Sequence, residues 1–389
     1  MKTIQSTSSN VDSNFQEEIR EFQEALCAYG FYNEADTAIL DFAKDIHVHY
    51  ANKECQQLLK KSREIMKKDI HDAIDVNPDE TFDHGDQSSA PPLSVPKMKI
   101  SSNIMELQEL ILDILQECGK AESAMLRQRL LCTACNVIRL YQSIVLVHHN
   151  NLINIPKQSA LFHNNCMYLA NWLLTISIQM QSYNITKEEI GITLYSDQIS
   201  SLRLLGTKYL NQQMKQQKNI MINTLRDSDL NLLSQVTKLS KTNEAVSKCI
   251  EQINDLESHW FQVLPDNVFA RCIALLYNVL LGELIQRVCS AEDISAAVAA
   301  DLVKYFDDVQ KNALCMFKKH TDVMSRVQLW QKFQELKNVL KGNLESIESQ
   351  WANGKGLLAT VFEKQEIKHL IRALFQNTDR RAELLMKLK

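Results

Sequence analysis

The placement of proline and glycine restricts the fold of this chain more than any other feature of its sequence. The 389 residues include only six prolines and nine glycines, and four of the prolines lie between Pro78 and Pro96. From Pro265 to Lys389 there is no further proline. Sandwiches, barrels and dinucleotide-binding folds need both residue types at their many short turns. Because the rest of the composition consists largely of good helix formers, the sequence predicts an all-α fold of consecutive elongated helical bundles.

The charge of the chain is nearly balanced, with 43 basic and 47 acidic residues and a net charge of −4. We therefore expect no binding of nucleic acid. The most apolar stretch, Cys272–Leu281, has about ten residues, whereas a membrane-spanning helix needs about 20, so we expect membrane contact only peripherally, through partners. The polar start of the chain and its ten cysteines are typical of reduced thiols in the cytoplasm.

Changes in composition predict four segments along the chain. Residues 1–74 have helical spacing and predict a helical segment that ends a middle domain. Residues 75–100 are acidic, then rich in Pro and Ser, and predict a linker. Residues 101–245 predict a helical bundle, and residues 246–389 predict a C-terminal helical bundle. In that last bundle the apolar steps from Leu329 to Trp351 predict one long amphipathic helix, which Gly354 ends.

Motifs of catalysis and metal binding are missing from the sequence. It contains no phosphate-binding loop, no nucleophile elbow and no zinc-protease helix. Cys132 and Cys135 form one CxxC pair, but no second pair completes a zinc site, so we expect both thiols in the core. His148 and His149 diverge on a helix, and we expect them at the surface. The sequence thus indicates a protein that is not an enzyme, with no catalytic residues, no cofactor and no metal.

The four tryptophans lie in or beside apolar stripes, where core packing is the expected role. Trp351 is also a candidate partner anchor, because it adjoins a glycine turn and Lys355. Residues 355–389 hold eight basic and four acidic side chains, which favours a solvated face or an acidic protein partner. The candidate partner-binding residues are Trp351, Lys355, Arg372, Phe375, Gln376, Arg380 and Arg381.

Several C-terminal segments resemble the Zeste-white-ten family. The likeness is specific over residues 260–389, weaker over 40–260 and indistinct at 1–35. Two positions depart from the family pattern, with Leu357 where a proline is expected and Glu363 where a Ser-type helix cap is expected. The segments that carry the likeness are WQKFQEL at Trp330–Leu336, LESIESQWANGKG at Leu344–Gly356, LIRALFQNTDRR at Leu370–Arg381, Leu264–Asp293, FHNNCMYL at Phe162–Leu169 and FAKDIHVHYA at Phe42–Ala51.

The resemblance implies a non-catalytic helical scaffold subunit of the tethering-complex type. One implied role is at the kinetochore in the spindle checkpoint, with Rod, with Zwilch and indirectly with the dynein machinery. The other is endoplasmic-reticulum tethering of Golgi-derived vesicles, with a Rint-type subunit and a neuroblastoma-amplified-type solenoid. The implied locations are the cytoplasm, the kinetochore in mitosis and the peripheral endoplasmic-reticulum membrane in interphase.

The implied partner of the C-terminal bundles is the large solenoid subunit, Rod-like or neuroblastoma-amplified-like. Family members are about twice as long as this chain, which resembles their latter half, and the Rint-type subunit pairs with their N-terminal arm. We therefore expect no binding of the Rint-type subunit. Two alternatives stay open from the sequence. One is a stand-alone helical adaptor that binds a peptide or a coiled coil, and the other is an enzyme with a cryptic Cys/His centre.

Overall fold

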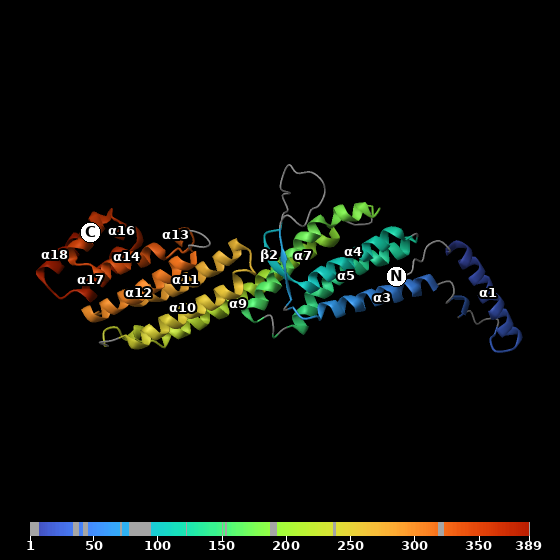
Figure 1. The fold of residues 1–389 in the computed structure, drawn as a ribbon, viewed down its shortest axis with the longest axis horizontal. Helices are drawn as coiled ribbons and strands as arrows, with labels where there is room; N and C mark the ends of the chain where they lie inside the picture. The colour runs from blue at the N-terminus through green and yellow to red at the C-terminus, as the bar shows by residue number, and fades with distance from the viewer. Residues whose placement is uncertain are drawn as a thin grey trace. The chain divides into compact units, whose positions relative to one another are not determined.

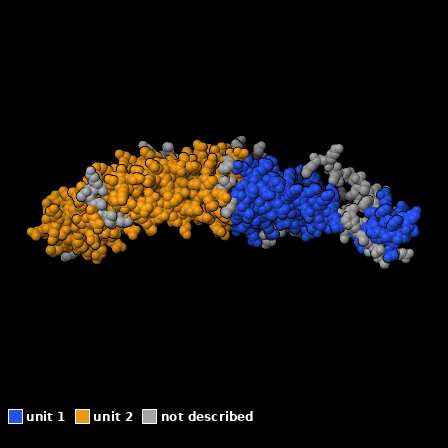
Figure 2. Space-filling view, turned by 90° about the horizontal axis from the view of Figure 1, so that it is seen from below, with its two compact units in different colours: residues 1–69, 102–150, 169–202 blue, residues 70–101, 151–168, 203–389 orange. Residues whose placement is uncertain are grey.

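The computed structural model confirms the predicted all-α fold. It describes residues 8–33, 39–41, 46–70, 72–77, 95–121, 123–149, 151, 154–186, 193–235, 239–317 and 323–388, and nearly all of their regular structure is helical. The chain divides into two compact units (Figure 2). Unit 1 comprises Met1–Asp69, Ser102–Asn150 and Leu169–Leu202, and unit 2 comprises Ile70–Ser101, Asn151–Tyr168 and Arg203–Lys389. The domain boundaries inferred from composition stay predictions.

Unit 1 is a bundle in which α3 packs on both α4 and α5 (Figure 1). His149, directly after α5, is only 4% exposed, and its Nε2 lies 3.1 Å from the carbonyl oxygen of Met66 at the end of α3. The prediction of a surface position was therefore wrong for His149, because this hydrogen bond allows an imidazole to be buried. The helices of the unit are α1 (Ser8–Ala28), α3 (Ile46–Met66), α4 (Ser102–Lys120), α5 (Ala124–His148) and parts of α7 (Pro156–Ser182) and α9 (Thr193–Arg226).

Unit 2 is built around α11 (Asp266–Cys289), which contacts α10, α13, α14 and α17. Its side chains are buried on almost every side, and Tyr277, Leu280 and Leu281 have no exposed surface. The other elements are the strands β1 (Ala73–Val76) and β2 (Met98–Ser101), η1 (Asp229–Leu232), α10 (Ser240–Trp260), α12 (Ala296–Phe317), α13 (Val323–Arg326), α14 (Trp330–Lys341), α15 (Leu344–Trp351), η2 (Ala352–Gly354), α16 (Leu357–Val361), α17 (Lys364–Leu374) and α18 (Asp379–Lys387).

Two short strands, which the sequence analysis did not predict, lie at the ends of the proposed linker. β1 and β2 pair in antiparallel register, with Ile74 opposite Ile100. Val95, Met98 and Ile100 are buried, so this end of the segment belongs to the core of unit 2. The residues between the strands, 78–94, lie outside the described residues.

Two adjacent asparagines of α7 hold this hairpin. The Asn164 Nδ2 donates to the carbonyl oxygens of Lys99 at 2.8 Å and Val263 at 2.6 Å. Asn165 accepts from the Ser101 backbone N–H at 3.0 Å and donates to the Ser101 hydroxyl at 2.6 Å. Both asparagines are almost fully buried. The strands therefore depend on side chains more than 60 positions away in the sequence.

The predicted long helix from Leu329 to Trp351 is broken into α14 and α15. Asn343 caps α15, because its side chain accepts from the Ser346 backbone N–H at 2.8 Å and the Ser346 hydroxyl accepts from the Asn343 backbone N–H at 2.9 Å. This reciprocal cap satisfies unpaired donors at the start of a helix. The apolar stripe therefore runs over two helices with a break between them. α15 ends at Trp351, and the left-handed residues after it are Ala352 (φ 43°), Asn353 (φ 52°) and Gly354 (φ 85°). The helix therefore ends close to the predicted stop, but the residue that caps it is Ala352.

Two helices are long and apolar enough to cross a membrane by length and composition alone. In α5 and α11 the most apolar 18-residue windows have mean hydropathies of 1.6 and 1.8. Half of the first window and 61% of the second are buried inside the protein. Core helices of helical bundles pass the same test, and packing accounts for the apolar character of both helices.

Limited proteolysis should cut this chain first between Asp75 and Lys99. The acidic and proline-rich composition of this segment opposes regular structure, whereas its two ends are held in the hairpin. A protease that cleaves after Glu has Glu80 as its target here, and mass spectrometry of the first fragments locates the cut. A first cut inside 265–376 would contradict both this prediction and the packed C-terminal helices.

Candidate partner-binding surfaces

A groove on the described part of unit 2 lies between the end of α9, η1 and the last turns of α11. It has a volume of about 670 Å³, and its lining is mainly polar. One wall carries Arg226, Leu230 and Ser234, and the other carries Glu283, Gln286 and Arg287. Basic and acidic groups therefore face the same groove.

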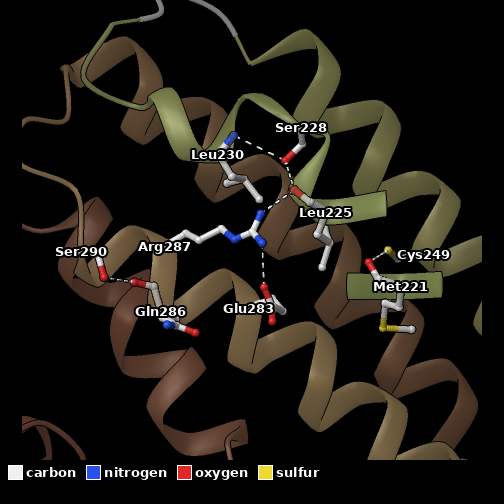
Figure 3. Close-up of polar contacts among 9 residues, drawn as sticks. All are labelled: Met221, Leu225, Ser228, Leu230, Cys249, Glu283, Gln286, Arg287 and Ser290. Atoms are coloured by element: carbon white, nitrogen blue, oxygen red, sulfur yellow. Dashed lines mark hydrogen bonds and ion pairs between the residues drawn. The ribbon is translucent and has the colours of Figure 1, made fainter. Parts of the chain in front are cut away.

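Arg287 joins the two walls of the groove (Figure 3). Its guanidinium donates to the carbonyl oxygen of Leu225 in the last turn of α9, and at 2.7 Å to the Glu283 carboxylate one turn back on α11. The side chains of Arg287 and Glu283 are 11% and 19% exposed. Because an arginine at a helix C-terminus satisfies orphan carbonyl groups, this pair anchors α9 to α11.

Two serines of the groove region are also bound to the backbone. The Ser228 hydroxyl donates to the Leu225 carbonyl oxygen at 2.6 Å, and the Ser290 hydroxyl donates to the Gln286 carbonyl oxygen at 2.7 Å (Figure 3). A nucleophilic serine donates its proton to a base within hydrogen-bond reach, whereas these two hydroxyl groups donate to backbone carbonyl oxygens. Neither serine is therefore placed as a nucleophile.

Buried thiols of unit 2 are likewise unsuited to nucleophilic chemistry. Burial raises the pKa of the Cys272 thiol to about 11 and that of Cys249 to about 12. Reactive cysteines need a lowered pKa. In the CxxC pair of unit 1, Cys135 is buried but Cys132 is exposed, so the prediction of two core thiols was wrong for Cys132. Among the residues that the structure describes, no cluster of three His, Cys, Asp or Glu could hold a metal.

The predicted partner-binding residues all lie in the last part of unit 2, but they differ in burial. All four tryptophans are in the core, as expected, and Trp351 is 6% exposed. Phe375 is half-buried against the core. Lys355, Arg372 and Gln376 are exposed. The ring of Trp351 thus stabilises the fold, and the exposed members supply whatever contact surface this region offers.

The two neighbouring arginines have different environments. Arg380, at the start of α18, forms an exposed ion pair with Glu345 of α15. The Arg381 guanidinium donates to the carbonyl oxygen of Phe375 at 2.6 Å and to the Asn377 side chain at 2.7 Å. It therefore caps the end of α17, a role that the sequence analysis missed because it depends on the turn after that helix.

Ion pairs join the basic C-terminal region to earlier helices. Lys387 pairs with Glu348 of α15 at 2.7 Å, and Glu366 of α17 pairs with Lys332 of α14 at 2.8 Å. With Arg380 bound to Glu345, two basic side chains of this region face acidic groups of α15. The Glu366 pair has the opposite effect, because it occupies an acidic group of the region itself.

The fold is that of an all-helical protein, and its described residues carry candidate recognition surfaces and no assembled catalytic set. Three profiles of one family match it in succession: "Centromere/kinetochore protein zw10, middle domain" at residues 2–66, "Centromere/kinetochore protein zw10, C-terminal" at 93–223, and "ZW10 C-terminal helical domain" at 244–388. The chain belongs to this Zeste-white-ten family.

Curated relatives agree with the profiles. The rat "Centromere/kinetochore protein zw10 homolog" is 31% identical over 410 residues, covering 95% of this chain and 53% of the relative. The "Centromere/kinetochore protein zw10" of Drosophila melanogaster is 28% identical, covering 99% of this chain and 51% of the relative. The chain spans about half the length of the curated relatives that it matches.

A solved structure shares the fold. The structure of Myo2-GTD in complex with Mmr1 matches with a TM-score of 0.51 at 12% identity, covering 88% of this chain and 83% of that chain. Identity this low indicates a common helical architecture only.

Proposed function

We propose that this chain is a non-catalytic helical scaffold subunit of a multisubunit complex. The observation that carries the proposal is the succession of three profiles of one family, in domain order, along most of the chain. The relatives are named as centromere and kinetochore proteins, which supports a kinetochore role. The absence of a catalytic set among the described residues is compatible with a scaffold.

The finer proposal concerns the complexes and the places where this chain acts. In mitosis it acts at the kinetochore in the spindle checkpoint, together with Rod and Zwilch and indirectly with the dynein machinery. In interphase it acts in the cytoplasm and at the peripheral endoplasmic-reticulum membrane, where it tethers Golgi-derived vesicles. It reaches the membrane through partners, and it holds them in place without chemistry.

The proposed direct partner is the large solenoid subunit, Rod-like or neuroblastoma-amplified-like. The proposed contact comprises Lys355, Arg372, Gln376 and the exposed edge of Phe375, together with Arg380 if its pair with Glu345 opens. Arg372 lies on α17, Phe375 and Gln376 follow it directly, Arg380 lies on α18, and Lys355 lies between η2 and α16. Their charge suits an acidic surface and makes association sensitive to salt.

Separate co-purification with each candidate subunit tests this proposal. We expect the chain to recover the solenoid subunit and to fail with the Rint-type subunit. Lys355→Glu with Arg372→Glu should weaken solenoid binding about tenfold, whereas Lys241→Glu with Lys311→Glu, which changes the charge equally on α10 and α12, should not. Recovery of the Rint-type subunit without the solenoid would contradict the assignment and favour a stand-alone adaptor.

Mass spectrometry of native complexes from interphase and mitotic cells distinguishes the two proposed assemblies. A scaffold subunit should appear in stoichiometric complexes with large partners, and the identity of those partners should change with the cell cycle. A chain found only with short peptides or one coiled-coil protein in both states would exclude the scaffold proposal.

A further inference from the structure

One face of α9 in unit 2 carries charge of a single sign. Between Arg203 and Arg226 the helix has five basic residues and no acidic residue. The opposite face packs into the core, where Leu210, Met214 and Met221 are at most 4% exposed. The basic side chains therefore lie toward solvent.

These side chains form a straight line along the helix. Successive members are four, three, four, three, four and four positions apart, which keeps them on one side of an α-helix. At about 1.5 Å per residue, the line is about 33 Å long. Its two aliphatic members are Leu204, which is 71% exposed, and Ile222, which is half-buried. The line consists of Leu204, Lys208, Asn211, Lys215, Lys218, Ile222 and Arg226.

The three central lysines are not neutralised by the described parts of the chain. No ion pair joins Lys208, Lys215 or Lys218 to a described carboxylate. Lysines of other helices in unit 2 differ, since Lys248 of α10 pairs with Glu244 at 2.6 Å and Lys304 of α12 pairs with Asp301 at 3.0 Å. The charges of these three lysines, of which Lys218 is half-buried, are therefore available to an outside group.

We propose that this line on α9 docks an acidic amphipathic helix of a partner protein. Alternating steps of three and four are the spacing at which two helices meet along a common seam. Glutamates of the partner at matching positions would face the lysines, while its apolar residues would contact Leu204 and Ile222. The exposed neighbours Gln212 and Gln216 are neutral, so beside the central lysines the positive charge is confined to this line.

The same observations argue against other anionic ligands. A membrane-surface helix buries a broad apolar face in the bilayer, whereas the aliphatic members of this line are separated by three lysines. Binding of single-stranded nucleic acid uses exposed aromatic rings. Tyr209, the aromatic residue of this stretch, instead packs edge-on against Phe162 with ring centroids 5.4 Å apart. The proposed docking site is distinct from the C-terminal contact surface and does not rest on the family assignment.

A designed pair of peptides tests the proposal on the full chain. One peptide is a helix of about four heptads with leucines along its seam and glutamates beside them, and the other has lysines in place of the glutamates. Fluorescence anisotropy should show binding of the acidic peptide that weakens with salt. Lys208→Glu, Lys215→Glu and Lys218→Glu together should reduce this binding at least about tenfold and create binding of the lysine peptide.

The matched control is Lys53→Glu, Lys60→Glu and Lys61→Glu, three exposed lysines of α3, which should leave binding within about twofold. Gain of lysine-peptide binding by the α9 variant also shows that this variant is folded. The proposal would be overturned if the unchanged chain fails to bind the acidic peptide at low salt. It would also be overturned if both triple variants lose the same amount of acidic-peptide binding. Tighter lysine-dependent binding to phosphatidylserine vesicles or to single-stranded RNA would overturn it as well.

Discussion

Replacing Asn164 by aspartate should lower the free energy of unfolding by about 3–5 kcal/mol at neutral pH, the cost of an uncompensated buried charge. The Asn164 amide nitrogen donates to two carbonyl oxygens, those of Lys99 and Val263, and the side chain has no exposed surface. A carboxylate of the same shape would turn both donations into repulsion between oxygens. The variant should therefore lose the hairpin contact before the helices of unit 2 unfold.

The loss of stability caused by Asn164→Asp should depend on pH. Burial among carbonyl groups raises the pKa of the new carboxyl in the folded state above its value in the unfolded chain. The folded state then binds more protons than the unfolded state, so stability falls as pH rises and recovers as pH falls toward the unfolded pKa. Urea unfolding followed by circular dichroism at pH 5 and pH 8 measures this difference.

An exposed site provides the control for this prediction. Asn211→Asp on α9 adds the same charge where it stays solvated, and surface substitutions of this kind change stability by about 0.5 kcal/mol or less. A small loss in Asn164→Asp that does not vary with pH would show that the two buried hydrogen bonds do not hold the hairpin.

Replacing Trp351 by alanine should cost about 3–5 kcal/mol, because it leaves a large cavity in the core. The ring is 6% exposed, and its Nε1 has no hydrogen-bond partner among the described residues. Domains are stable by roughly 5–15 kcal/mol, so this change threatens the C-terminal helices. Trp351→Phe retains an aromatic ring and removes the unpaired N–H, and should cost less than about 1.5 kcal/mol.

Phe375→Ala should cost less than Trp351→Ala, about 2 kcal/mol or less, because part of its ring already contacts water. Met386→Ala, at a side chain that is 71% exposed, is the neutral control. If Trp351→Ala and Phe375→Ala lower the free energy of urea unfolding equally, burial does not explain the cost of these truncations.

Local sequence signals mark the helix ends of this region. A glycine after an apolar stripe favours the left-handed conformation and predicts a stop at Gly354, whereas α15 ends at Trp351 and is capped by Ala352. The break before α15 carries an equally local signal, because Asn343 and Ser346 have the spacing of a reciprocal cap. It was missed because the apolar steps continue on both sides of the break, and periodicity does not reveal a cap.

The sequence by itself determined the helical class, the apolar stripes and the family, because helix propensity, apolar period and turn residues act over a few neighbouring positions. Only the tertiary structure decided which hydrogen bonds the buried polar side chains form. The hairpin depends on Asn164 and Asn165, the end of α9 on Arg287, and the end of α17 on Arg381. A buried polar group must find a partner wherever the folded chain places one, and no local pattern specifies that partner.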